Sequence, residues 1–126
     1  MALSKKLLQQ LHDRDGHCWH CGSEVDLVPH HRINRGMGGS KLLDRPDNLM
    51  MVCAVYNGAM ESSADTARLA RQWGHKLPVW AELETPVWDV VTGWWYLFRD
   101  GTKMRVPDKD FLGLRLNRYK RKGEND

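Results

Sequence analysis

The sequence contains no apolar run long enough to cross a lipid bilayer, which takes about 20 consecutive apolar residues. Its first residues also lack the apolar segment of a secretion signal. There are no internal repeats, and the three cysteines are an odd number that disfavours a full disulfide framework. We therefore predict a soluble, cytoplasmic protein without a membrane partner.

The residues that are present suit one modest domain. The chain has 126 residues, 41% of them hydrophobic, and its six tryptophans can build a core, although not a deep one. Domains of this size often depend on a staple such as a bound metal ion. The net charge of +3 permits nucleic acid as a partner without requiring it.

Hydrophobic periodicity predicts a mixture of helices and strands. Leucines at helical spacing predict a first helix over 4–13, with Ser4 as its N-cap and Gly16 after its end. The further elements expected before residue 75 are a strand at 25–28, a buried apolar stretch at 49–52 that is a strand or the approach to a helix, and a helix in one or two pieces over 57–74.

The chain changes character after residue 77. Proline-punctuated extended segments come first, and a β-rich run then ends at Asp100-Gly101, which is a strong hairpin signal. We expect a main domain over 1–80, a β-hairpin extension over 81–110 packed on the same domain, and a basic tail over 111–126.

Three cysteines have the spacing of a metal site. Cys18 and Cys21 form a Cys-x-x-Cys pair followed by glycine, which suits a zinc knuckle, and Cys53 resembles part of a second half. The fourth ligand is expected three residues later, where the chain has Tyr56, a poor zinc ligand. Either another group completes the site, or the cysteines are small buried hydrophobes without a metal. The nearest groups are His17 and His20.

A second group of polar residues begins at Pro29-His30-His31. Adjacent residues on a strand point to opposite faces, so one histidine can bind an ion while the other faces a substrate. Asn57 and Glu61 are four apart and share a helix face. His30, Asn57 and Glu61 can then close on one divalent cation, while His31 deprotonates a water molecule. Such a site suits hydrolysis of a phosphodiester bond.

The loop after the histidine pair is rich in glycine and contains two arginines. The glycine spacing is not that of a P-loop, and no Gly-Lys-Ser/Thr ends it. Arg32 and Arg35 are expected to contact DNA phosphates.

These residues resemble the HNH endonuclease family, which has the ββα-metal fold (the HNH or His-Me finger). The signature is His30-His31 at a strand end, Asn48 seventeen residues after His31, and Asn57 nine residues after Asn48 on a helix that also bears Glu61. The cysteines match the zinc-binding version of the family. The phrase His-His-Arg-x-x-Arg-Gly-Met-Gly-Gly resembles small bacteriophage HNH proteins, and the likeness covers roughly residues 5–80.

The resemblance implies an α+β fold with a ββα-metal core, an N-terminal helix, degenerate zinc-knuckle elements and a C-terminal β-hairpin. It implies that His31 is the general base and that His30 and Asn57 are metal ligands. Asn48 would hydrogen-bond the backbone across the loop and hold the base in place. Glu61 stands where many members have histidine, so a carboxylate there favours Mg²⁺ or Mn²⁺, with Ni²⁺ and Zn²⁺ as the other candidates.

The implied function is a metal-dependent endonuclease that nicks DNA with little sequence readout. By analogy with the phage proteins, it would work beside terminase and the packaging machinery in the cytoplasm of a bacterial host. The alternative is a non-catalytic nucleic-acid-binding or scaffold protein that keeps the fold, and Tyr56 is the feature that favours it.

Overall fold

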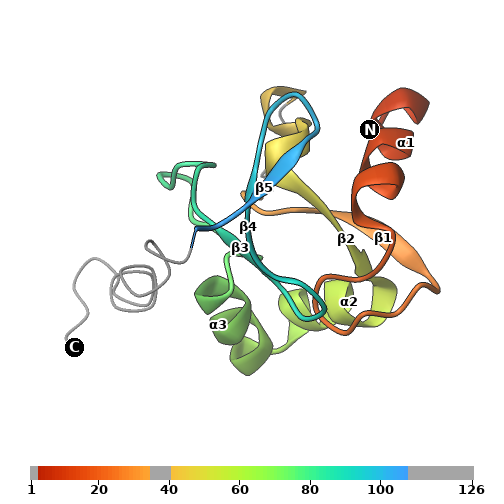
Figure 1. Cartoon of the computed structure of the whole chain (residues 1–126). Helices are drawn as coiled ribbons and strands as arrows, with labels where there is room; N and C mark the ends of the chain where they lie inside the picture. The colour runs from red at the N-terminus through yellow and green to blue at the C-terminus, as the bar shows by residue number, and fades with distance from the viewer. Residues whose placement is uncertain (1–2, 35–40, 108–126) are drawn as a thin grey trace.

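The computed structural model describes residues 3–34 and 41–107, which form an α+β structure with three α-helices and two small antiparallel sheets (Figure 1). The first helix, α1 (Lys5–Asp15), begins where predicted. The Ser4 hydroxyl accepts the Leu7 N–H at 3.1 Å, and Gly16 ends the helix in the left-handed region at φ 69°. The predicted first helix is therefore confirmed, and it runs two residues further than expected.

Helix α1 is fixed to the rest of the molecule by buried polar contacts at its C-terminal end. Arg14 donates to the carbonyls of Pro46 and Leu49, each at 2.7 Å, and Asp15 accepts the Met51 N–H at 2.9 Å. Leu11 adds an apolar contact because it packs with Leu49 and Met51. These bonds join α1 to the strand that carries Cys53 at its end.

The first sheet is a two-stranded ribbon of β1 (Leu27–His31) and β2 (Leu49–Cys53). The strands are antiparallel, with Leu27 opposite Cys53 and His31 opposite Leu49. Of the two alternatives expected for 49–52, a strand or the approach to a helix, the structure has the strand. The strand predicted at 25–28 begins later and includes both histidines, because Asp26 has a φ of 55° that extended backbone cannot adopt.

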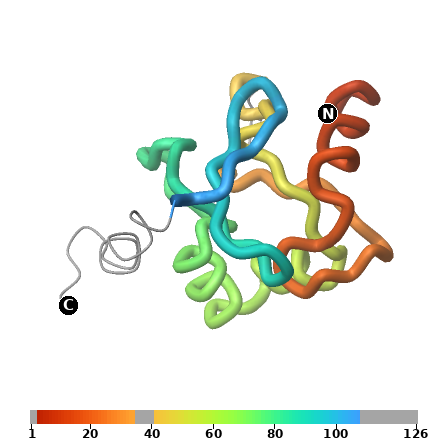
Figure 2. Tube along the Cα trace, in the orientation of Figure 1, coloured from red at the N-terminus to blue at the C-terminus, as the bar shows by residue number. Residues whose placement is uncertain are grey.

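Two helices follow β2 directly and lie side by side, as the trace in Figure 2 shows. Helix α2 (Ala54–Ser62) and helix α3 (Ala64–Gln72) are separated by Ser63, whose hydroxyl accepts the Thr66 N–H at 3.2 Å and caps α3. The helical region expected in one or two pieces is present in two, and α2 begins three residues earlier than expected.

The second sheet has the order β3–β4–β5, with β3 (Val87–Asp89), β4 (Gly93–Leu97) and β5 (Lys103–Arg105). The predicted hairpin is confirmed between β4 and β5, and Gly101 in its turn has a φ of 94° that favours glycine. The sequence did not predict β3 as a sheet strand. The tail over 111–126 lies outside the described residues.

The two sheets share a core. The buried side chains of Val87 and Leu97 belong to the same apolar cluster as Met50 and Val52. Burying an apolar side chain of this size contributes about 1.5–3 kcal/mol. The short 3₁₀ helices η1 (Lys41–Leu43) and η2 (Pro46–Asn48) lead into β2. None of the helices in the described part of the chain has the length and apolar character needed to span a membrane.

Candidate functional site

A cleft of about 220 Å³ lies where the end of β1 meets α2 and the segment after α3. Its walls are mostly polar, and they come from parts of the chain more than forty residues apart. The residues that line the cleft are Pro29, His30, His31, Asn34, Asn57, Glu61 and Lys76. Four of the residues predicted from the sequence therefore meet in one place: the two histidines, Asn57 and Glu61.

His30 is nearly buried, with 8% of its surface exposed, and its ring is fixed by the backbone. Its Nε2–H donates to the His75 carbonyl at 2.6 Å, because a carbonyl can only accept. The other ring nitrogen, Nδ1, therefore carries the lone pair. Burial lowers the pKa of His30 to about 4, so the ring is neutral at physiological pH, as a metal ligand must be.

His31 is more exposed and is oriented by a carboxylate. Its Nε2 lies 2.7 Å from Oδ1 of Asp44, which follows η1. A carboxylate accepts, so the Nε2–H donates and Nδ1 keeps the lone pair that a general base needs. No sequence pattern indicates this contact, since Asp44 stands thirteen residues after His31 in a turn-like segment.

Asn48 is fully buried and joins the two sides of the loop that follows β1. Its Oδ1 accepts the Ile33 N–H at 2.8 Å, and its Nδ2 donates to the carbonyls of Ile33 and Leu43 at 3.1 and 3.0 Å. These are the backbone hydrogen bonds expected across the loop. They hold the segment next to His31, and Asn48 lines no part of the cleft.

Asn57 and Glu61 reach the cleft from the same face of α2, as their spacing predicted. Glu61 is exposed, and its Oε2 lies 3.5 Å from the ammonium nitrogen of Lys76. Lys76 was not singled out in the sequence, and it places a positive charge beside the predicted metal ligands. A bound cation must compete with this charge, while a phosphate group is attracted by it.

Arg32 does not contact solvent, and the structure corrects its predicted role. Its side chain is fully buried, and its guanidinium donates to backbone carbonyls of distant segments. Those carbonyls belong to Asp47, Gly74, Leu83 and Thr85. A guanidinium held in this way cannot reach a DNA phosphate, so Arg32 fixes loops instead. Arg35, the other predicted phosphate contact, lies outside the described residues.

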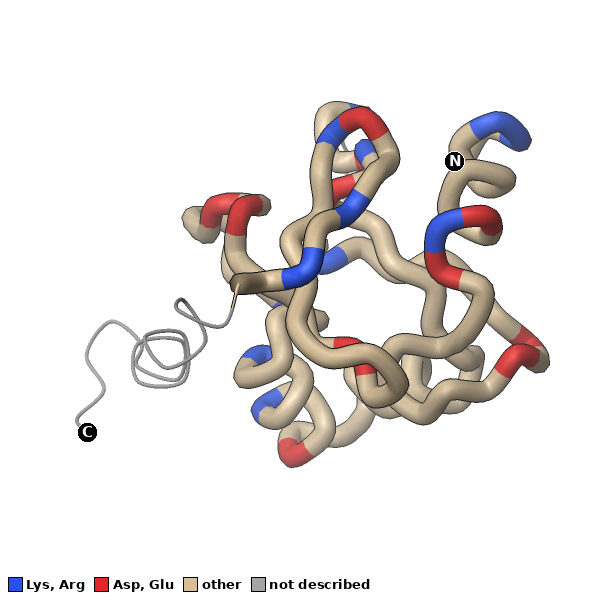
Figure 3. Tube along the Cα trace, viewed as in Figure 1, with Lys and Arg blue, Asp and Glu red and all other residues tan. Residues whose placement is uncertain are grey.

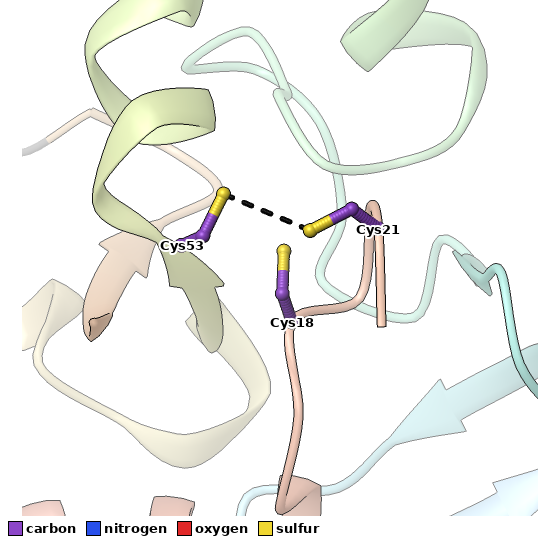
Figure 4. Close-up of side chains that lie close together, drawn as sticks. All are labelled: Cys18, Cys21 and Cys53. Atoms are coloured by element: carbon purple, nitrogen blue, oxygen red, sulfur yellow. Dashed lines mark hydrogen bonds between the residues drawn. The ribbon is translucent and has the colours of Figure 1, made fainter. Parts of the chain in front are cut away.

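The three cysteines converge at the opposite end of the β1–β2 ribbon. Figure 4 shows Cys18 and Cys21 on the loop after α1, pointing toward Cys53 where β2 meets α2. All three sulfur atoms lie within 4.8 Å of one another, so they can hold a metal ion. The Cys21 and Cys53 sulfurs are 3.8 Å apart. Two thiolates on a tetrahedral zinc ion, with Zn–S bonds of about 2.3 Å, are separated by about 3.8 Å.

Backbone hydrogen bonds support the cysteine cluster. The His20 N–H donates to the Cys18 sulfur at 3.3 Å, and the Tyr56 N–H donates to the Cys53 sulfur at 3.4 Å. Burial raises the pKa of Cys18 to about 11, whereas a backbone hydrogen bond at Ser23 lowers the pKa of the exposed Cys21. The thiols therefore do not ionise alike without a cation.

Neither predicted histidine joins the cluster. The His17 ring donates to the buried Asp89 carboxylate at 2.8 Å. The His20 ring stacks on Tyr56, with ring centroids 3.8 Å apart and planes 3° apart. Within residues 3–34 and 41–107, no histidine nitrogen or carboxylate oxygen lies with the three sulfurs. The prediction that His20 or His17 completes the site is therefore not met, because both rings have other partners.

Tyr56 occupies the fourth position of the cysteine pattern but faces the core. Its side chain is almost fully buried, and its hydroxyl lies 2.6 Å from Nδ1 of His75. Cys21 and Cys53 also line an apolar pocket of about 310 Å³ together with residues of α2 and α3. The described residues thus supply three sulfur ligands and no fourth.

Charge over the described residues is mixed. Figure 3 shows basic and acidic positions interspersed along the trace rather than gathered on one face. Among the described residues, Lys76 is the lysine or arginine that lines the cleft.

Comparison of the chain with protein-family models, with curated proteins and with solved structures gives no match in any of the three.

Proposed function

We propose that this protein is a metal-dependent endonuclease of the HNH type, which hydrolyses DNA phosphodiester bonds one strand at a time. The observation that carries the proposal is the meeting of His30, His31, Asn57 and Glu61 in one cleft. The succession of β1, β2 and α2 along the chain, with β1 paired to β2 and with β1 and α2 lining the cleft, supports a ββα-metal core.

The donor set of the cleft fits a divalent cation. His30 offers a neutral ring with a lone pair on Nδ1, and Asn57 and Glu61 offer oxygen. One nitrogen and two oxygen donors suit Mg²⁺ or Mn²⁺, and also Ni²⁺ or Zn²⁺. When bound, the cation stabilises negative charge on the phosphate and on the leaving 3′ oxygen.

We assign the proton transfer, the attraction of the phosphate group and the positioning of the base to side chains of this protein. His31 takes a proton from water at Nδ1, while Asp44 stabilises the protonated ring through Nε2. Lys76 attracts the phosphate group. Asn48 keeps the His31 segment in place through the loop backbone. Asp44 and Lys76 are the functional residues that the sequence alone did not reveal.

The same proposal assigns a structural zinc ion to Cys18, Cys21 and Cys53. The sulfur separation of 3.8 Å and the two N–H···S hydrogen bonds support it. The resemblance to small phage proteins, and nothing else, extends the proposal to a role beside DNA-packaging proteins in a bacterial cytoplasm.

A nicking assay tests the function. Supercoiled plasmid is incubated with the protein and Mg²⁺, Mn²⁺, Ni²⁺ or Zn²⁺, and wild type is compared with His31→Ala. We expect metal-dependent nicking that falls by about 10²–10⁴-fold in the variant, the usual contribution of a general base. His12→Ala is the matched control, because His12 is exposed on α1 and does not line the cleft.

Two results would count against the proposal. Equal nicking by wild type and His31→Ala would remove the base role of His31. Retained DNA binding without nicking, in every metal, would favour the catalytically silent nucleic-acid-binding protein instead.

A further inference from the structure

A buried hydrogen-bond path connects the residue beside the cysteine cluster with the histidine of the cleft. Tyr56 stands on α2, three residues after Cys53, and its Oη lies 2.6 Å from Nδ1 of His75. The His75 carbonyl in turn accepts the Nε2–H of His30 at 2.6 Å. Tyr56, His75 and His30 are respectively 3%, 0% and 8% exposed. The path Tyr56–His75–His30 is therefore shielded from water along its length.

The donors and acceptors along this path are fixed by chemistry. The Nε2 of His75 lies 2.6 Å from the Trp88 carbonyl, which only accepts, so Nε2 carries the proton. Nδ1 of His75 therefore has the lone pair, and the Tyr56 hydroxyl donates to it. Burial lowers the pKa of His75 to about 3, so this arrangement holds at physiological pH.

The backbone around His75 is anchored as well. The His75 N–H donates to the Ala70 carbonyl at 2.9 Å at the end of α3. Arg32 binds the backbone on both sides of His75. Its Nε donates to the Gly74 carbonyl at 2.8 Å, and its own carbonyl accepts the Leu77 N–H at 2.7 Å. The His75 side chain adds a third anchor through Tyr56 and Trp88. The carbonyl that orients His30 is therefore held from several directions.

We infer that Tyr56 and His75 are positioning residues for the cleft, which fix the ring of His30 so that Nδ1 is available to a cation. This inference rests on the proposed function, because it assigns the orientation of a proposed metal ligand. It also explains the tyrosine in the cysteine pattern: a cysteine at position 56 could add a fourth sulfur to the cluster, but it is too short to reach Nδ1 of His75. Mutation of a hydrogen-bond partner of a metal-binding histidine commonly lowers metal affinity about 10–100-fold.

Two variants of Tyr56 separate positioning from folding. Tyr56→Phe removes only the hydroxyl, and we expect Mn²⁺ binding at the cleft to weaken about tenfold, at the low end of such effects. Tyr56→Cys should weaken Mn²⁺ binding similarly while tightening zinc binding at the cluster, so loss of the fold cannot explain the result. Tyr96→Phe makes the same chemical change on β4, outside the cleft lining, and should leave Mn²⁺ affinity within about twofold.

The readouts are Mn²⁺ titration and long-range ¹H–¹⁵N spectra of the histidine rings. Wild type should show His30 and His75 as neutral Nε2–H tautomers at pH 7, and Tyr56→Phe should change the signals of both rings. Unchanged His30 signals and unchanged Mn²⁺ affinity in both Tyr56 variants would overturn the inference. If wild type neither binds Mn²⁺ nor nicks DNA, the proposed function fails, and the ring spectra still decide whether Tyr56 controls His30.

Discussion

The two ends of the β1–β2 ribbon are built in contrasting ways. At one end, His30 and His31 have defined tautomers because each donates an Nε2–H to an oxygen at 2.6–2.7 Å. At the other end, Cys18, Cys21 and Cys53 face one another with weaker N–H···S contacts and no fourth ligand from the described residues. The histidine cleft is formed by hydrogen bonds, whereas the cysteine cluster brings together three sulfur atoms that could hold a metal ion.

Under the proposed function, a metal ion at the cysteine cluster serves stability, whereas a metal ion in the cleft serves chemistry. Once deprotonated, thiols within 4.8 Å of one another repel unless a cation neutralises them. The cleft instead contains its own cation, Lys76, 3.5 Å from Glu61. Removing metal should therefore unfold one end and merely inactivate the other.

The largest expected effect is the loss of stability on removal of metal from the cysteine cluster. A chelator strong enough to strip zinc should lower the free energy of unfolding by at least about 3 kcal/mol, because a structural zinc site contributes its binding energy to folding. Urea denaturation with and without chelator measures this.

The cysteine variant Cys18→Ala provides the control for chelation. It should be much less stable than wild type when zinc is present, and the two should differ far less once zinc is stripped. If the purified protein contains no zinc and is equally stable with and without chelator, the cysteine cluster does not hold a structural zinc ion.

The next largest expected effect is a loss of stability in acid, which is caused by buried histidines at the cleft end of the ribbon. Burial lowers the pKa of His30 to about 4 and of His75 to about 3, so both rings are neutral in the folded protein while the unfolded chain takes up protons below about pH 6.5. Their contribution is complete above pH 6.5 and declines as the pH falls toward these values. Between pH 7 and pH 5 the loss should be roughly 4 kcal/mol.

Denaturation midpoints at several pH values measure this loss of stability in acid. The variant His75→Gln isolates the part of the loss that His75 causes. Glutamine has no proton to gain in this range, so the variant should show about half of the pH dependence. An identical slope in wild type and His75→Gln would mean that His75 does not resist protonation in the folded state.

A smaller effect is expected on nicking when Asp44 is changed. In Asp44→Asn the amide can present either a donor or an acceptor to His31, so the ring loses its fixed tautomer and the carboxylate no longer stabilises the protonated form. We expect the nicking rate to fall about 10–100-fold with little change in stability. Asp13→Asn, an exposed change on α1, serves as the control and should have no effect on the rate.

The smallest effect concerns Lys76. In Lys76→Met the stem is kept and the charge is lost, so DNA should bind about threefold more weakly, with a salt slope reduced by about 1. Mn²⁺ should bind more tightly, because the charge beside Glu61 is gone. Lys5→Met on the exposed side of α1 is the matched control. Weaker binding of both DNA and Mn²⁺ would show that Lys76 acts on the shape of the cleft rather than on its charge.

Much of the fold could be predicted because local signals agree with the tertiary structure. The Ser4 cap, the Gly16 stop and the Asp100-Gly101 hairpin turn all lie where the sequence places them. The shared face of Asn57 and Glu61 follows from helical periodicity alone. These features depend on residues within about five positions of each other, which a sequence pattern can report.

The rest depends on contacts that no local pattern carries. Arg32 looks like a phosphate contact in a glycine-rich loop, but carbonyls 42 and 51 residues away draw its guanidinium into the interior. Tyr56 resembles a lost zinc ligand until its partner His75, nineteen residues later, is seen. The roles of Asp44 and Lys76 likewise appear only when the segment after η1 and the segment after α3 reach the cleft.

The most direct test of a cation site in the cleft is to locate Mn²⁺ by the paramagnetic broadening of nuclear resonances. On titration of zinc-loaded protein with substoichiometric Mn²⁺, the signals of His30, Asn57 and Glu61 should broaden first, and plasmid nicking should rise over the same concentrations. Broadening centred on exposed carboxylates elsewhere, such as Glu82 and Glu84, or nicking that does not follow cleft occupancy, would contradict the account.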